Sequence, residues 1–477
     1  MSRFAKIVAT IGPACQDEDR ITDLLKAGVN VARLNFSHGT HEDHALVIER
    51  LRRLASQLNR SIMILQDLQG PKIRTGQIGG GQIQLERGQA FTLTTQPMVG
   101  DARCVSVDFP QLIECARPGG RILLDDGNLE LAITAVKADY VETRVVLGGP
   151  LKSHKGVNLP GADLDIPGFT EKDQDDLAFG LQAKVDAVAI SFVRTPNDVQ
   201  VVREAIRRLS PDRIFTPIVA KLERPEALKN LDQIVALADG VMVARGDLGV
   251  EMPPEMVPIA QKQIIECANR NAKVVITATQ MLDSMIHNPR PTRAEASDVA
   301  NAIFDGTDAV MLSGETAAGQ YPVQAVETMD AIVRQAEAHL EWSRYRGPDA
   351  VTTKDDTYYM TQAASALASD RNVAAIAVFS RSGRTVRLMS KTRPDVPIHA
   401  FTPEEGTYNR MNLYWGVTPH LVPHVETIET MIEAMEAVML SSTPIQAGQQ
   451  VVLVCGYPVL QVRPTNMVLL HTLGDKL

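Results

Sequence analysis

The stretch Val219-Ala220-Lys221-Leu222-Glu223-Arg224-Pro225 is a short apolar run that ends in a lysine, a glutamate and an arginine. A second stretch of this kind, Val243-Ala244-Arg245-Gly246-Asp247-Leu248-Gly249, follows it. Nearly continuous apolar runs are typical of strands that are covered on both faces of a parallel sheet. A helical pattern follows each run, so we interpret both as strand–helix units.

The same unit recurs along the chain and predicts a closed barrel. Strand candidates are Lys6–Ala9, Val31–Phe36, Ile62–Gln66, Ala187–Phe192, Pro217–Leu222, Val241–Ala244, Val274–Ala278 and Ala309–Leu312. Eight strand–helix units indicate an α/β fold of the (β/α)8 or TIM-barrel type. In helix 40–60 the apolar positions share one stripe. Thr40, Thr170 and Thr195 precede an Asp by three positions, as in a capping box.

Polar residues follow most of these strands, at the end where barrel enzymes carry their active sites. They are Arg33, Asn35, Ser37, Asp67, Lys221, Glu223, Gly246, Asp247, Thr277, Thr279, Ser313 and Glu315. Carboxylates at such a rim can hold a divalent cation through oxygen ligands. A lysine beside them can stabilise negative charge in a transition state, which suits chemistry on a phosphorylated substrate.

Two further domains are expected. Short alternating runs with Gly and Asp-Gly turns replace the strand–helix pattern after the third strand, which indicates an inserted all-β domain. A third strand–helix region follows a loop-like stretch near residue 345. We predict a catalytic barrel over residues 1–70 and 169–345, an inserted β-barrel lid domain over 71–168, and a C-terminal α/β regulatory domain over 346–477.

Composition excludes several classes of function. The chain has 477 residues, a net charge of −9 and only 4% aromatic residues, which disfavours nucleic acid or an anionic membrane as partner. Five scattered cysteines without metal-ligand spacing favour a reducing cytoplasm over a disulfide framework. We find no signal peptide and no apolar run long enough to span a membrane.

Five motifs together resemble the pyruvate kinase family. They span residues 31–39, 70–76, 244–249, 277–282 and 311–317, and include Arg-Leu-Asn-Phe-Ser, Gly-Pro-Lys-Ile-Arg and Arg-Gly-Asp-Leu-Gly. The resemblance implies transfer of the phosphoryl group of phosphoenolpyruvate to ADP, giving ATP and pyruvate, the final step of glycolysis. It also implies Mg²⁺ or Mn²⁺ as cofactor, a homotetramer and a cytoplasmic enzyme.

The resemblance assigns a role to each rim residue that matches a family motif. Glu223 and Asp247 match the Mg²⁺ ligands, and Lys221 matches the lysine that stabilises the transition state. The main-chain N–H groups of Gly246 and Asp247 match the contacts to the substrate carboxylate. Thr279 matches a hydroxyl near that carboxylate and the methylene carbon.

The phosphate-binding residues follow in the same way. Arg33 and Arg74 match arginines that hold the substrate and nucleotide phosphates, for which a guanidinium fork is well suited. Lys155 matches the lid lysine that reaches ADP, and Asn35 is also assigned to the nucleotide. The proton donor to enolpyruvate stays open, with Thr279, Ser313 and Glu315, through water, as the relay considered.

Asn35, Ser37, Asp67 and the carbonyl of Leu68 match the positions that hold K⁺ in many relatives. The chain differs beside them, because Lys72 stands where K⁺-dependent members usually carry a glutamate. A lysine ammonium can take over the electrostatic role of the ion, so we predict activity without K⁺.

The segment Ser380-Arg381-Ser382-Gly383-Arg384-Thr385 lies between a strand and a helix and has the composition of an anion pocket. The family binds a phosphorylated allosteric effector here, although an ordinary helix cap explains this segment equally well. The loop 457–463 lacks the glycine-rich character found in relatives activated by sugar bisphosphates. We expect a phosphosugar or a nucleoside monophosphate.

Two alternatives remain from sequence alone. A lyase or aldolase acting on a pyruvate enolate also uses Mg²⁺-bound carboxylates on such a barrel. A metabolite-sensing scaffold without catalysis is the second alternative. Arg74 and Lys155 on the inserted domain favour a nucleotide substrate over the first, and the retained rim residues argue against the second.

Overall fold

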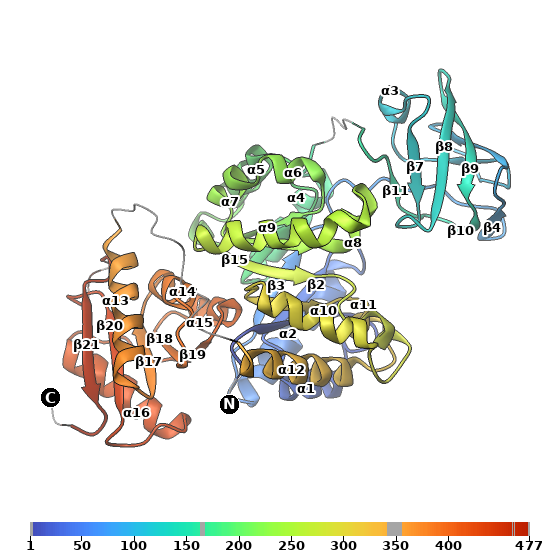
Figure 1. The fold of residues 1–477 in the computed structure, drawn as a ribbon. Coiled ribbons are helices and arrows are strands. Elements are labelled where there is room, and N and C mark those ends of the chain that lie inside the picture. Colours follow the sequence, from blue (N-terminus) through green and yellow to red (C-terminus); the bar gives the residue numbers. More distant parts are fainter. Residues whose placement is uncertain (1–2, 163–166, 341–354, 460, 462, 476–477) are drawn as a thin grey trace.

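The computed structural model describes residues 3–162, 167–340, 355–459, 461 and 463–475. Its centre is a closed parallel barrel (Figure 1). The strands, in their order around the barrel, are β1 (Lys6–Ile11), β16 (Ala309–Leu312), β15 (Val274–Ala278), β14 (Gly240–Ala244), β13 (Ile218–Leu222), β12 (Ala187–Ile190), β3 (Met63–Asp67) and β2 (Val31–Asn35). The predicted (β/α)8 fold is therefore confirmed.

Helices surround the barrel and complete its core. They are α1 (Glu18–Ala27), α2 (His41–Gln57), α4 (Glu171–Gln182), α5 (Pro196–Leu209), α6 (Pro225–Lys229), α7 (Leu231–Leu237), α8 (Arg245–Glu251), α9 (Val257–Arg270), α10 (Arg293–Phe304), α11 (Gly314–Ala317) and α12 (Pro322–Ala338). One apolar cluster fills the barrel interior and a larger one lies between strands and helices, which explains the continuous apolar runs. Capping boxes begin α2, α4 and α5 as predicted.

The inserted region lies between β3 and α4 and consists mainly of strands. A six-stranded sheet has the order β11 (Val157–Asn158), β7 (Arg121–Leu124), β8 (Leu129–Val136), β9 (Tyr140–Leu147), β5 (Ala90–Thr94), β6 (Cys104–Ser106). A separate pair joins β10 (Gly149–Lys152) to β4 (Gln82–Leu85), and α3 (Leu112–Cys115) is a single turn. This lid encloses an apolar core of its own.

The C-terminal region is a five-stranded sheet with helices on both faces. Its order is β19 (Val417–Leu421), β18 (Ile398–Thr402), β17 (Ala375–Phe379), β20 (Gln450–Cys455), β21 (Met467–Thr472), with only the last pair antiparallel. The helices are α13 (Asp356–Arg371), α14 (Arg384–Lys391), α15 (Glu405–Arg410) and α16 (Ile428–Ser442). The predicted boundary at residue 345 falls outside the described residues.

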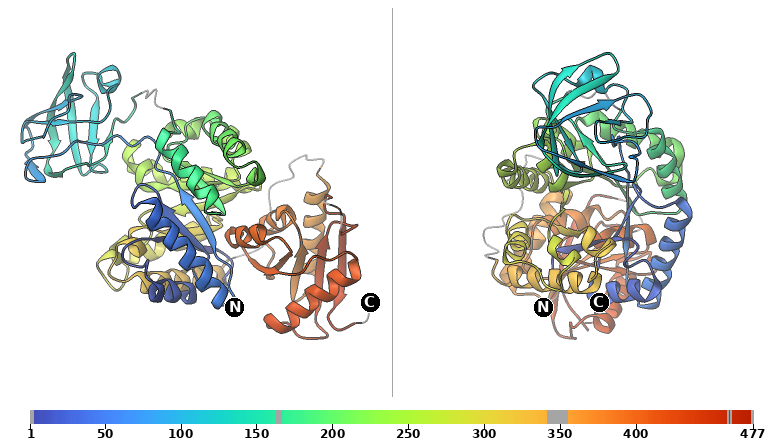
Figure 2. Two further views of the ribbon diagram at one scale, coloured as in Figure 1. Left: turned by 180° about the vertical axis from the view of Figure 1, so that it is seen from behind. Right: turned by 90° about the vertical axis from the view of Figure 1, so that its right-hand side faces the viewer.

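The lid and the C-terminal domain lie at opposite sides of the barrel (Figures 1 and 2). Leu413 of the C-terminal domain packs into the apolar cluster of the barrel interior. Lys391 and Arg393 both form ion pairs with the buried Asp308, which precedes β16, at 2.5 and 2.8 Å. The C-terminal domain therefore covers the N-terminal end of the strands and leaves the opposite end to the lid. In the described part of the chain, no helix is long and apolar enough to cross a membrane.

Candidate active site

Lys221, near the end of β13, is at the centre of a buried polar cluster in the mouth of the barrel. Its ammonium lies 2.8 Å from Glu223 Oε1 and 3.3 Å from Asp67 Oδ1, and it donates a hydrogen bond to Ser191 Oγ at 2.8 Å. The side chain of Lys221 is only 11% exposed. Three neighbouring strands, β3, β12 and β13, thus bring their C-terminal polar residues to one ammonium group.

Arg33, on β2, extends this cluster by one strand. Its Nε donates to Asp67 Oδ2 at 2.6 Å and its Nη1 donates to Thr10 Oγ1 at 3.0 Å. Burial alone raises the pKa of Asp67, but Lys221 and Arg33 outweigh it and hold this pKa below its usual range. Conversely, burial lowers the pKa of Lys221, and Asp67 and Glu223 raise it above its ordinary value. Ionised forms are favoured on both sides of this pair.

Glu223 is a buried carboxyl group between a lysine and a second carboxylate. Burial raises its pKa, Lys221 opposes the shift, and the negative charge of Asp247 adds to it. Its second oxygen accepts a hydrogen bond from Phe192 N–H at 2.8 Å. Two nearby carboxylates of which one is destabilised by burial and like charge form an oxygen donor set that fits Mg²⁺ or Mn²⁺.

Gly246 and Thr279 meet where β14 and β15 end. Gly246 N–H donates to Thr279 Oγ1 at 2.7 Å, and a Cβ on Gly246 would come within 3.5 Å of that side chain. Thr279 has a φ of +68°, which is unusual for a β-branched residue. Arg245 supports this backbone by donating to the carbonyl of Thr279 at 2.7 Å. The hydroxyl is therefore held above the barrel mouth by a strained but supported backbone.

A cavity of about 310 Å³ lies between the lid and the barrel. Arg74 and Lys155 of the lid and Asp247 of the barrel line it. Lys155 Nζ lies 2.6 Å from Asp125 Oδ1 of the lid. The pKa of His38, which also lines the cavity, is lowered by burial first and then by the charges of Lys72, Arg74 and Arg33. The cavity is therefore a region of concentrated positive charge in an acidic protein.

Comparison with known proteins identifies the family. Residues 2–326 match the model of the pyruvate kinase barrel domain, and residues 359–471 match that of the pyruvate kinase alpha/beta domain. The chain belongs to the pyruvate kinase family. The resemblance seen in the sequence motifs is thereby confirmed, and with it the assignment to the kinases, which are phosphotransferases.

Similar proteins extend over the whole chain. Pyruvate kinase of Geobacillus stearothermophilus is 46% identical over 482 residues, covering 100% of this chain and 81% of the relative. Pyruvate kinase of Mycobacterium tuberculosis is 42% identical over 475 residues, covering 100% of this chain and 99% of the relative. The crystal structure of a pyruvate kinase from Cryptosporidium parvum superposes with a TM-score of 0.91 at 35% identity, covering 99% and 96% of the two chains.

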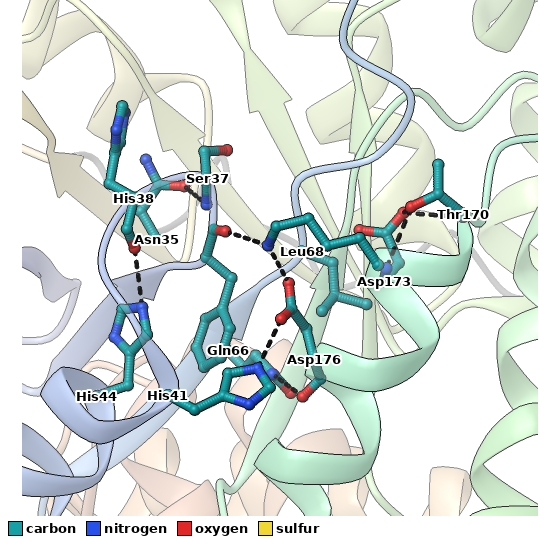
Figure 3. Close-up of polar contacts among 12 residues, drawn as sticks. Asn35, Ser37, His38, His41, His44, Gln66, Leu68, Thr170, Asp173 and Asp176 are labelled. Atoms are coloured by element: carbon teal, nitrogen blue, oxygen red, sulfur yellow. Dashed lines mark hydrogen bonds and ion pairs between the residues drawn. The ribbon is translucent and has the colours of Figure 1, made fainter.

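Among the residues that match the K⁺ positions of the family, Asn35, Asp67 and Leu68 have protein contacts, although Asp67 Oδ1 has an ion pair and no hydrogen bond among the described residues. Asn35 Oδ1 accepts from Ser37 N–H at 3.2 Å, and the Leu68 carbonyl accepts from Ser191 Oγ at 2.7 Å. Both carboxylate oxygens of Asp67 lie next to cations. Figure 3 labels Asn35 at the end of β2, Ser37 in the loop that follows, and Leu68 directly after β3. The role of these residues stays a prediction.

Helix α4 supports these loops, which sequence reasoning did not foresee. Lys172 Nζ donates to the Phe36 carbonyl at 2.8 Å and lies 2.5 Å from Asp176 Oδ2. The other carboxylate oxygen of Asp176, Oδ1, lies 2.8 Å from His41 Nε2 (Figure 3). Asp173 accepts from Gly70 N–H at 3.0 Å. The signal in the sequence was the capping box at Thr170 and Asp173, which located the helix but not its contacts.

Two rim predictions need correction. Thr277 is completely buried and donates to Thr307 Oγ1 at 3.0 Å, so its hydroxyl faces the segment before β16 rather than the rim. Alternation alone would place Thr277 and Thr279 on the same side of a strand. Thr279 lies beyond the end of β15 with a φ of +68°, so it departs from the regular strand and reaches the mouth, whereas Thr277 stays inside. Glu315 accepts from Ser313 N–H at 2.7 Å and Leu282 N–H at 3.1 Å, so both of its oxygens hold backbone.

The predicted effector segment lines a second cavity, of about 280 Å³, at the start of α14. Gly383 N–H donates to Ser380 Oγ at 3.0 Å, and Gly383 has a φ of +79°. Arg381 pairs with Glu404 at 2.9 Å, and Arg384 pairs with Asp355. Within the facing loop, Leu460 and Val462 lie outside the described residues.

Proposed function

We propose that this chain transfers the phosphoryl group of phosphoenolpyruvate to ADP, with Mg²⁺ or Mn²⁺, and so forms ATP and pyruvate. The observation that carries the proposal is the buried Lys221–Glu223 contact of 2.8 Å beside Asp67 and Arg33. Phe192, whose N–H binds Glu223, lines the adjacent cavity together with Asp247 and with Arg74 and Lys155 of the lid. Phosphoryl transfer requires positioning and charge neutralisation rather than covalent help.

The barrel residues divide this work. Glu223 and Asp247 are the proposed metal ligands, and a bound divalent ion supplies neutralisation of the charge on phosphate and enolate oxygens. Lys221 is the proposed stabiliser of the phosphoryl group in transit and of the enolate oxygen. Arg33 binds the substrate phosphate. Because Lys221 and Arg33 are already oriented by buried carboxylates, they require little reorganisation during the reaction.

The remaining contacts orient the two substrates. We assign the carboxylate of phosphoenolpyruvate to the N–H groups of Gly246 and Asp247, at the start of α8. In this structure the Gly246 N–H is held by Thr279, so the hydroxyl has to turn when the carboxylate binds. Arg74 and Lys155 are assigned to the phosphates of ADP, where Lys155 exchanges Asp125 for phosphate.

A coupled assay tests the proposal. The purified chain is mixed with phosphoenolpyruvate, ADP and Mg²⁺, and ATP and pyruvate are measured separately. We expect equimolar formation of the two products. Pyruvate without ATP indicates the lyase-type alternative, and absence of both products refutes the proposal. The family to which the chain belongs supports the kinase over both alternatives.

Thr279 is the residue that we propose for the proton transfer to enolpyruvate. Its hydroxyl donates to the Ala278 carbonyl at 2.6 Å, and Ser313 Oγ is buried without a hydrogen-bond partner among the described residues. Thr279→Ala should abolish the enolisation of pyruvate, which is measured by the exchange of its methyl protons with solvent. The variant should retain phosphoryl transfer. Equal loss of both activities contradicts the relay.

Three further assignments belong to the proposal. The engaged oxygens of Asn35, Asp67 and Leu68, together with Lys72, support activity without K⁺. The pocket formed by Ser380, Arg381, Ser382, Gly383, Arg384 and Thr385 is proposed to bind a phosphorylated allosteric effector. Membership of the family supports a cytoplasmic enzyme and a homotetramer. Light scattering of the purified protein tests the number of subunits.

A further inference from the structure

Three polar side chains join the lid to the two segments that carry the proposed metal ligands. Asn158 Nδ2 donates to Glu251 Oε1 at 2.9 Å, and Arg224 Nη1 donates to the same oxygen at 2.8 Å. Arg224 directly follows Glu223, and Glu251 ends α8, whose first turn carries Asp247. One carboxylate oxygen at the end of α8 therefore accepts hydrogen bonds both from the lid and from the segment that follows β13. We name Asn158, Glu251 and Arg224 the pivot triad.

The lid is attached to the barrel by a two-stranded neck that ends at this triad. Main-chain hydrogen bonds of 2.8 and 2.9 Å join residues 73–75 to residues 155–157. Asn158 directly follows the neck and pairs with Leu123 at the edge of the lid sheet, where the sheet meets the neck. A residue at this place moves less than the tip of the lid when the lid swings, so the contact with Glu251 holds the pivot.

Stability alone does not explain the triad. Arg224 and Glu251 are only 4% and 7% exposed. Arg224 Nε and Glu251 Oε2 are nevertheless without a hydrogen-bond partner among the described residues, although Arg224 Nε lies 3.6 Å from Glu226 Oε2. A buried ion pair with incomplete hydrogen bonding adds little to stability and is more readily explained by the geometry that it fixes.

The triad also lies where that geometry matters. Arg224 and Asn158 line the cavity that Asp247, Arg74 and Lys155 line. In the proposed reaction, the lid holds the nucleotide phosphates and the barrel holds the metal. The two sets of contacts have to stay in register to within a fraction of an ångström for phosphoryl transfer to proceed.

We propose that the pivot triad consists of positioning residues, which fix the neck of the lid and couple its placement to that of Glu223 and Asp247. The inference rests on the proposed function for its effect on catalysis. It also predicts two properties of the free protein, the protection of the neck and the affinity for Mn²⁺. None of the three side chains is assigned to touch the reacting atoms.

An exchange of the amide and the carboxylate tests the contact. Asn158→Asp faces Glu251 with a second carboxylate, so we expect about a fivefold rise in the KM for ADP and weaker Mn²⁺ binding. Amide hydrogen exchange in residues 73–75 and 155–157 should become faster. The double variant Asn158→Asp/Glu251→Gln again presents one carboxylate and one amide to Arg224, so all three quantities should return towards wild type.

Two matched changes serve as controls. Gln84→Glu makes the same amide-to-carboxylate change at an exposed position of β4, and Glu255→Gln makes the reverse change at an exposed position near α8. Both should leave all three measurements unchanged. A double variant that is no better than Asn158→Asp overturns the proposal, as does a response to the controls of equal size.

The readouts separate this inference from the proposed function. Mn²⁺ binding is followed by electron paramagnetic resonance, and amide exchange by mass spectrometry, both without substrate. If Mn²⁺ binding and amide exchange follow the expected pattern while the wild type converts no phosphoenolpyruvate, the proposed function is wrong and the proposal for the pivot triad is supported. If the wild type turns over normally but Asn158→Asp changes neither the amide exchange of the neck nor the affinity for Mn²⁺, the proposal for the pivot triad is wrong and the proposed function is unaffected.

Discussion

The mouth of the barrel and the anion pocket of the C-terminal domain both contain arginines, but the ion pairs of these arginines differ in burial and in whether they share a carboxylate. In the barrel, Arg33 and Lys221 are each 11% exposed and share Asp67, which is 1% exposed. In the C-terminal pocket, Arg381 and Arg384 are 39% and 50% exposed and pair with separate surface carboxylates. Buried, shared pairs fix the position of a charge, whereas exposed pairs exchange partners at little cost.

Removal of the central barrel charge should have the largest effect. Lys221→Met deletes the proposed stabiliser of the transition state, so we expect kcat to fall by about 10²–10³ or more with the fold retained. Glu223 loses its ion-pair partner and Asp67 keeps only Arg33, so the melting temperature should also fall. Steady-state kinetics and circular dichroism measure both effects. Turnover near that of the wild type refutes the role of Lys221, and Lys221→Arg controls for charge alone.

The second largest effect should be a loss of stability at low pH, which we expect to be greater in the C-terminal domain than in the barrel. In the C-terminal sheet, His399 Nδ1 lies 3.0 Å from His420 Nε2, and burial lowers the pKa of His399 to about 3 and that of His420 to about 4. The unfolded state, with a pKa of about 6.5, then binds more protons, so stability falls as the pH drops through about 6.5 towards 4. For His399 alone the loss between pH 7 and pH 5 is about 2 kcal/mol.

The ion pairs of Asp67 in the barrel mouth should resist the same change. The lowered pKa of Asp67 contributes stability that is present above its unfolded value of about 3.9 and is lost only below it. Amide exchange at pH 7 and pH 5 should therefore accelerate in β18 and β19 before β2 and β3. The variant His399→Gln/His420→Gln should weaken this dependence, and the exposed His424→Gln should not. Equal acceleration in both regions contradicts the difference.

Lys72, an exposed residue that lines the cavity between lid and barrel, tests whether a lysine takes the place of an exchangeable K⁺ ion. The wild type should be active in a buffer free of K⁺ and Na⁺. Lys72→Glu removes the fixed cation, so its activity should drop roughly tenfold without K⁺ and recover when K⁺ is added. Initial rates across a K⁺ titration measure this response. A strict K⁺ requirement in the wild type, or a variant indifferent to K⁺, contradicts the assignment.

The sequence predicted the barrel well because strands covered on both faces leave a continuous apolar run. The strands at residues 274–278 and 309–312 coincide with the predicted ones, and the others differ by one or two residues at their ends. The strand β19 gives no such signal. It is an edge strand that contains Pro419 and buries only Val417, so it has no apolar run to detect.

The candidate site was predictable in its residues but not in its contacts. Most polar residues at the strand ends were visible, since the barrel fixes which end faces the mouth. Ser191, which follows β12 and accepts a hydrogen bond from Lys221, was not among them. The sharing of Asp67 between Arg33 and Lys221 depends on neighbouring strands far apart in sequence, and so does the joining of Asn158 to Arg224 through Glu251. No local pattern encodes such meetings, which follow only from the closed order of the barrel strands and the path of the lid.

The exposed arginines of the C-terminal pocket should produce the smallest effect. A phosphorylated ligand has to displace Glu404 from Arg381, and the net gain of exchanging one exposed ion pair for another is small. We therefore expect a phosphosugar or a nucleoside monophosphate to shift the half-saturating phosphoenolpyruvate concentration only about two- to fivefold. Arg381→Ala should abolish this shift and leave the rate without effector unchanged, whereas the exposed Arg371→Ala should leave the shift intact. Because α14 begins at this pocket and ends at Lys391, which pairs with Asp308 of the barrel, the shift should appear in substrate affinity rather than in kcat. Initial rates against phosphoenolpyruvate measure it, and a shift that survives Arg381→Ala places the effector elsewhere.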